Sequence, residues 1–176
     1  INNRYGTYAK LSKENLQTFT RLTKEAGLSG EALGELQDTT FLTKNTLEEQ
    51  TVEYKGQVKL LKATTGLAIN EATVLEGIKD ISAATKLTLG GSAEAMATAV
   101  FKAKALGVEM KDLAAISSSL LNFQSSIEDE LSAELLTGKQ LNLERARAAA
   151  LMDDQATLAD ELAKNIGTAA DFTSMN

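Results

Sequence analysis

Apolar residues recur at steps of three and four along most of this chain, which is the spacing of one buried helix face. Nowhere do four or more residues alternate between apolar and polar in a β-branched run bounded by turns, the pattern of a half-buried strand. Pro is absent, so no residue forces a break inside a helix. The sequence therefore predicts an all-α fold, with several amphipathic helices joined by short Gly-containing turns as hairpins or a bundle.

Glycines mark the expected ends of the helices, because glycine most easily adopts the left-handed conformation that closes a helix. The predicted ends are Gly27, Gly66, Gly107, Gly138 and Gly167. Their unequal intervals disfavour a regular solenoid. Gly66 also separates a weakly defined N-terminal helical segment, residues 1–65, from residues 66–176. Within the first segment, residues 30–65 fit either one bent helix or two.

Short polar side chains are expected to cap the starts of the helices, because their oxygens accept hydrogen bonds from free backbone N–H groups. Each candidate stands just before a stretch of helical spacing. The predicted N-caps are Ser12, Ser29, Asn70 and Ser92. Near the C-terminal end, Thr168 with Asp171 three residues later resembles a capping box.

The longest amphipathic pattern predicts one central helix over about residues 109–137. Its apolar stripe consists of Leu113, Ile116, Leu120, Phe123, Ile127, Leu131 and Leu135. Aromatic residues make up only 5% of the chain and Trp is absent, so the core must be built from smaller side chains that bury little area per contact. We therefore expect the stripe to pack against other copies of the chain, in a homo-oligomer of the coiled-coil kind.

Four carboxylates follow one another along this helix: Glu128, Asp129, Glu130 and Glu134. They are expected to form a solvated face, or to meet Arg145 and Arg147 of a neighbouring helix or chain. The two arginines are two positions apart and so do not share a helix face, which favours separate salt bridges. Both arginines are assigned to the predicted interface.

Several kinds of chemistry are disfavoured by residues that the chain lacks. It contains no Cys and no His, which removes thiolate nucleophiles, the commonest general base and the commonest transition-metal ligands. We therefore predict no catalytic, cofactor-binding or metal-binding residues, and no enzyme. The net charge of −6 argues against specific nucleic-acid binding, which needs a basic face.

Residues 120–127 (LLNFQSSI), Glu130-Leu131 and residues 133–147 (AELLTGKQLNLERAR) resemble a segment of the phage tail tape measure proteins. Residues 148–151, 162–165 and 167–170 are also similar to that family, and the likeness is firmest over about residues 100–176. The chain begins with Ile and stops without a clear helix ending. We therefore expect it to be an internal or C-terminal segment of a longer polypeptide.

The resemblance implies a structural role. Tape measure proteins set tail length, lie together in several copies in the lumen of the tail tube, and meet the tail tip or baseplate hub. They leave ahead of the DNA on infection and are implied to contact the cell envelope in passing. The expected location is accordingly the tail of the virion, after synthesis in the cytoplasm of the bacterial host.

Two other functions remain open from the residues alone. One is a helical adaptor or signalling domain that binds a partner helix in an apolar groove. The other is a carboxylate-dependent hydrolase, which would need two acids across a cleft with raised pKa values. A stable monomer with an open groove would favour the adaptor, whereas a discrete oligomer would favour the tail protein.

Overall fold

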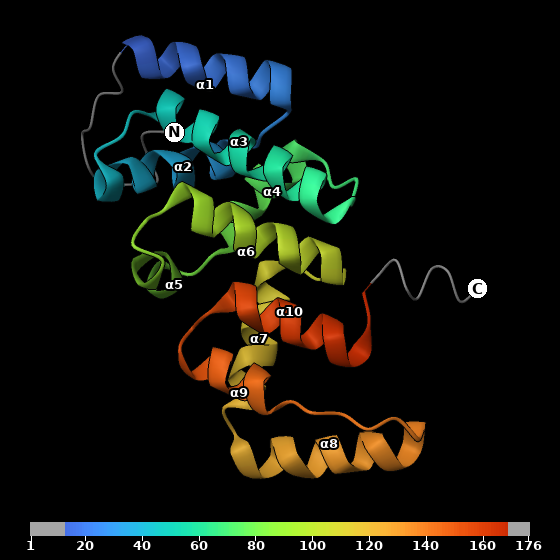
Figure 1. The fold of residues 1–176 in the computed structure, drawn as a ribbon. Helices are drawn as coiled ribbons and strands as arrows, with labels where there is room; N and C mark the ends of the chain where they lie inside the picture. Colours follow the sequence, from blue (N-terminus) through green and yellow to red (C-terminus); the bar gives the residue numbers. More distant parts are fainter. Residues whose placement is uncertain (1–12, 169–176) are drawn as a thin grey trace. The chain divides into compact units, whose positions relative to one another are not determined.

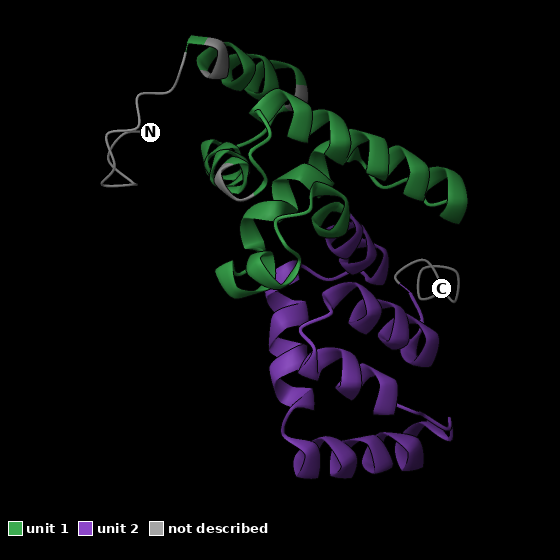
Figure 2. Cartoon of the chain, turned by 60° about the vertical axis from the view of Figure 1, so that its left-hand side comes forward, with its two compact units in different colours: residues 1–97 green, residues 98–176 purple. Residues whose placement is uncertain are grey.

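The computed structural model describes residues 13–168, which form ten α-helices and one short 3-10 helix with no strand among them (Figure 1). The all-α prediction is thereby confirmed. The chain divides into two compact units, Ile1–Ala97 and Thr98–Asn176, with the boundary inside α6, Ala93–Leu106 (Figure 2). The boundary predicted at residue 65 falls instead between two helices of unit 1. No helix in the described part of the chain is both long and apolar enough to cross a bilayer.

Unit 1 contains the helices up to the first residues of α6. They are α1 (Lys13–Ala26), α2 (Gly30–Thr43), α3 (Leu47–Thr65), α4 (Glu71–Gly77), η1 (Ile78–Asp80) and α5 (Ala83–Thr88). Leu36, Tyr54, Val58 and Leu75 are fully buried among them. The Tyr54 hydroxyl donates to the Met96 Sδ at 3.8 Å, so the largest side chain of this core keeps a polar partner.

Residues 30–65 form two helices, which resolves the alternative left open by the apolar spacing. Lys44 takes a left-handed conformation with φ 61° and ends α2. Thr46 then opens α3 with a capping box, in which its side chain accepts from the Glu49 N–H and the Glu49 carboxylate accepts from the Thr46 N–H. This reciprocal pair satisfies two backbone donors at once and sets where the second helix begins.

The predicted N-caps and the predicted C-terminal glycines agree with the structure wherever it describes them. The hydroxyl of Ser29, the amide oxygen of Asn70 and the hydroxyl of Ser92 each accept a backbone N–H from the first turn of the following helix. All of the predicted stop glycines have a positive φ, between 66° and 94°. Ser12 and Asp171 lie outside the described residues.

Unit 2 is built around α9 (Glu144–Leu151), which packs against both α10 (Gln155–Ile166) and α7 (Met110–Leu120). Ala146, Ala149 and Ala150 are buried at these contacts, and their small side chains let the helices approach closely. Leu113 and Leu158 are fully buried beside them. α8 (Phe123–Thr137) lies at the edge of the unit, with other helices of the unit on one side only (Figures 1 and 2).

The single central helix predicted over 109–137 is wrong, because the chain turns at Leu121 and Asn122 between α7 and α8. Asn122 leaves the helical region with φ −81° and ψ 79°. Just before the turn, the hydroxyls of Ser118 and Ser119 bond back to carbonyls four residues earlier, a pattern that weakens and bends helices. The apolar spacing runs through the turn without interruption, so periodicity alone predicts one helix.

Candidate functional site

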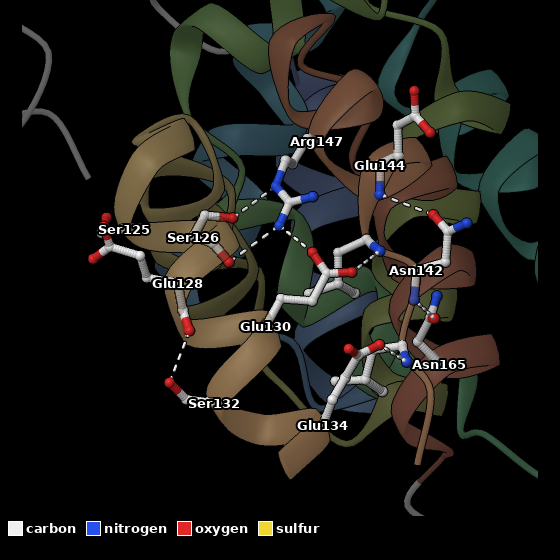
Figure 3. A network of polar contacts seen from close by, with 12 residues as sticks. Ser125, Ser126, Glu128, Glu130, Ser132, Glu134, Asn142, Glu144, Arg147 and Asn165 are labelled. Atoms are coloured by element: carbon white, nitrogen blue, oxygen red, sulfur yellow. Dashed lines mark hydrogen bonds and ion pairs between the residues drawn. The ribbon is translucent and has the colours of Figure 1, made fainter. Parts of the chain in front are cut away.

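Arg147 is the centre of a buried polar network that ties α8 to α9 (Figure 3). Its Nε donates to the Ser126 Oγ at 2.8 Å, and its Nη2 donates to the Ser126 carbonyl at 3.1 Å. The same Nη2 forms an ion pair with the Glu130 carboxylate. Because both charged side chains are almost fully buried, this planar guanidinium fixes the orientation of α8 in a way that a lysine could not.

The carboxylates of α8 also hold the loop that connects it to α9. The second oxygen of Glu130 accepts the Leu143 N–H at 2.9 Å, and Glu134 accepts the Leu141 N–H at 2.7 Å. From α10, the Asn165 side-chain oxygen accepts the Asn142 N–H at 2.8 Å (Figure 3). Together with the Lys139 N–H, which donates to the Thr137 Oγ1 at 3.3 Å, four backbone donors of the loop between Gly138 and Leu143 are bonded to side chains of α8 and α10, which restrains its conformation.

The pKa of Glu130 follows from this surrounding. Burial raises the pKa of the carboxyl, but the Leu143 N–H and the Arg147 guanidinium lower it by more, so that it lies below the ordinary value for Glu. Glu130 is thus a permanently charged member of the network at neutral pH. It acts as a hydrogen-bond acceptor and ion-pair partner, not as an acid.

The two arginines make separate ion pairs, as their spacing predicts. Arg147 pairs with Glu130, while the Arg145 Nε lies 3.5 Å from the Glu161 carboxylate of α10. The expectation that the acidic cluster meets an arginine of a neighbouring helix is therefore confirmed for Glu130 and Arg147. Arg145 is 76% exposed, whereas Arg147 is committed to its own chain and is not free to contact a partner.

The structure divides the predicted apolar stripe into a buried part and an exposed part. Leu113 and Leu120 belong to the core of unit 2 and Ile116 is half-buried, so the interface prediction does not hold for the two leucines in this conformation. The α8 members are exposed to 48% at Phe123, 47% at Ile127, 55% at Leu131 and 87% at Leu135. We call these four side chains the α8 face.

An open groove of about 600 Å³ adjoins the α8 face, between α8 and α9. Phe123, Ile127, Ala148 and Leu151 supply its apolar lining. Its polar lining comes from Glu130, Asn142, Glu144 and Arg147. Because the Glu130 and Arg147 charges neutralise each other, the exposed Glu144 leaves this groove with an acidic rim.

This arrangement offers a ligand an apolar surface whose neighbouring charged groups Glu130 and Arg147 are already paired within the chain. Among the described residues, no three His, Cys, Asp or Glu side chains are grouped so that they could hold a metal ion. Both inward carboxylates of α8 are occupied by backbone N–H groups. What α8 offers a ligand is an apolar surface on a rigidly oriented helix.

Sequence reasoning missed three members of the network: Ser126, Asn142 and Asn165. The spacing of Glu130 and Glu134, one helical turn apart before a loop of free N–H groups, was the available signal for the loop contacts. The Ser126 contact depends on the turn at Asn122, and no local pattern shows it.

Comparisons with protein-family models, with curated proteins and with solved structures found no match.

Proposed function

We propose that this chain is a structural segment of a phage tail tape measure protein and works in several copies, held by tail tube and baseplate hub proteins. In this role it helps set tail length and leaves the tail ahead of the DNA. The observation that carries the proposal is the α8 face. The Arg147 ion pair with Glu130 fixes α8 on α9, and α8 exposes Phe123, Ile127, Leu131 and Leu135.

The position of the resemblance supports this proposal. The residues that resemble the tape measure family fall mainly on α8, the loop after it and α9, and the likeness continues into α10. A surface helix of a monomeric protein normally turns its apolar stripe inward, toward its own core. On α8, Ser126 and Glu130 bond to Arg147, Phe123 and Ile127 line the open groove toward α9, and Leu131 and Leu135 are exposed. The helix therefore leaves apolar side chains that its own core does not cover, as an assembly surface would.

The charge of the chain is also consistent with a tail lumen. A net charge of −6 would repel DNA that passes the same space. Such a protein would line or fill the channel without binding the genome.

The experiment that tests the proposal is an in-frame deletion of residues 13–168 in a phage that encodes this chain. The expected result is shorter tails in electron micrographs, by up to about 1.5 Å per deleted residue if the segment lies extended as helix in the tail. Lys111→Ala is the matched control, because it keeps the length of the chain and changes only an exposed side chain outside the predicted interface. Tails of unchanged length and normal infectivity after the deletion would contradict the proposal.

The groove between α8 and α9 favours a second candidate, an adaptor domain that binds one partner helix. Its apolar lining and its volume of about 600 Å³ suit a few side chains from such a helix. A chain that stays monomeric at every concentration and binds one equivalent of a helical partner would favour the adaptor over the tail protein.

A further inference from the structure

α8 is attached to unit 2 in a different way from α7, α9 and α10. Ser126 is the one buried residue of α8, and it is polar. The other three helices bury apolar side chains in a shared core, among them Leu113, Ala146 and Leu158. Because burial of an apolar face supplies most of the stability of a packed helix, α8 has the least to lose when it leaves the core.

Polar contacts with Arg147 hold α8 in place instead (Figure 3). Ser126 accepts from the guanidinium through both its hydroxyl and its carbonyl, and Glu130 forms the ion pair with it. Phe123 and Ile127 remain about half exposed, so apolar packing against α9 adds little. The position of α8 thus depends on one charged side chain of the core.

The loop after α8 is bonded to α8 itself. Glu130 accepts the Leu143 N–H, and Glu134 accepts the Leu141 N–H. Both bonds lie within residues 122–143, so α8 and its loop can leave the core together without breaking them. We call residues 122–143 the α8 arm.

The chain can bend where the arm begins. Asn122 leaves the helical region with ψ 79°, and its side chain caps no N–H of α8. At the other end of the arm, the Asn142 N–H donates to Asn165 of α10 in a neutral hydrogen bond at 2.8 Å. The helices that lead into and out of the arm, α7 and α9, pack against each other. The arm can therefore move away while the core stays closed.

We propose that the α8 arm opens from the core of unit 2 as one unit, hinged at Asn122 and held shut by Arg147. The shut arm presents the α8 face alone. In the open state, Ser126 and Glu130 of the arm and Arg147 of the core face solvent as well. The inference uses contacts inside unit 2 and does not depend on the tail role, so either can fail without the other.

Hydrogen exchange of the full chain, followed by mass spectrometry of peptides, tests the arm. An isolated helix of the length of α8 is marginal in water, so its amides lose protection whenever the arm opens. In the wild type, these amides are expected to exchange at least about tenfold faster than the buried amides of α7 and α10, which need the core to unfold. Equal protection of all three helices would overturn the inference.

Two variants test whether Arg147 holds the arm shut. Arg147→Ala is expected to bring exchange in α8 close to that of an unfolded peptide, while α7 and α10 keep at least about tenfold more protection. Ser126→Ala removes one bond, keeps the ion pair and is expected to raise exchange in α8 about fivefold. Arg145→Ala, on the same helix as Arg147 but exposed, is the matched control and should leave α8 unchanged. Joint loss of protection in α7, α8 and α10, or unchanged exchange of α8 in both variants, would also overturn the inference.

Discussion

Replacing Arg147 with alanine is expected to destabilise unit 2 far more than any exposed charge change does. The variant leaves the Glu130 carboxylate buried without its guanidinium, and it removes both hydrogen bonds to Ser126. Breaking a buried ion pair by deleting one partner costs about 3–5 kcal/mol. Because Glu130 keeps the Leu143 N–H, we expect a loss near the lower end, about 3 kcal/mol.

Urea unfolding followed by circular dichroism measures this loss, with Arg145→Ala as the control. Arg145 is 76% exposed, and its ion pair at 3.5 Å is expected to contribute at most about 1 kcal/mol. Arg147→Lys should recover only part of the stability, because an ammonium cannot reach Ser126 and Glu130 with the same fork of donors. Equal and small losses in Arg147→Ala and Arg145→Ala would refute the view that Arg147 braces α8.

Two further predictions concern Glu130 and two glycines. Folding lowers the pKa of Glu130 despite its burial, so the stabilisation is present above the ordinary Glu pKa and is lost as the pH falls through the folded value. The difference in unfolding free energy between the wild type and Glu130→Gln should therefore shrink from about pH 7 to about pH 3; a constant difference would count against the pairing. Gly138→Ala should cost about 1–2 kcal/mol because φ is +67° there, whereas Gly56→Ala, in a helix, should be neutral or stabilising. Equal effects of the two substitutions in thermal unfolding would contradict this.

Local signals predicted the ends of the helices well. Gly66 and Gly138 end helices because a left-handed residue satisfies carbonyls within the same turn, and Asn70 caps a helix through an N–H only two residues away. These interactions depend on a few neighbouring residues, so the sequence alone contains them. The capping box of Thr46 and Glu49 is equally local and marks the break between α2 and α3, but it was not among the predicted N-caps.

The turn at Asn122 could not be predicted in the same way. The stripe from Leu120 to Phe123 and Ile127 keeps helical spacing through it. The turn is stabilised from a distance, because it lets Ser126 and Glu130 face Arg147 of another helix. Periodicity describes which side of a helix is apolar, but it does not say whether that side lies in the core, as at Leu113, or in solvent, as at Leu131.

The central claim is that the α8 face is an assembly surface, and the mass of the chain in solution tests it most directly. Light scattering over a range of concentrations should give a discrete oligomer or a growing series for the wild type. Ile127→Asn/Leu131→Asn, which changes only exposed side chains of α8, should be a folded monomer. A wild type that is a folded monomer at every concentration, with the same mass as the variant, would contradict the account.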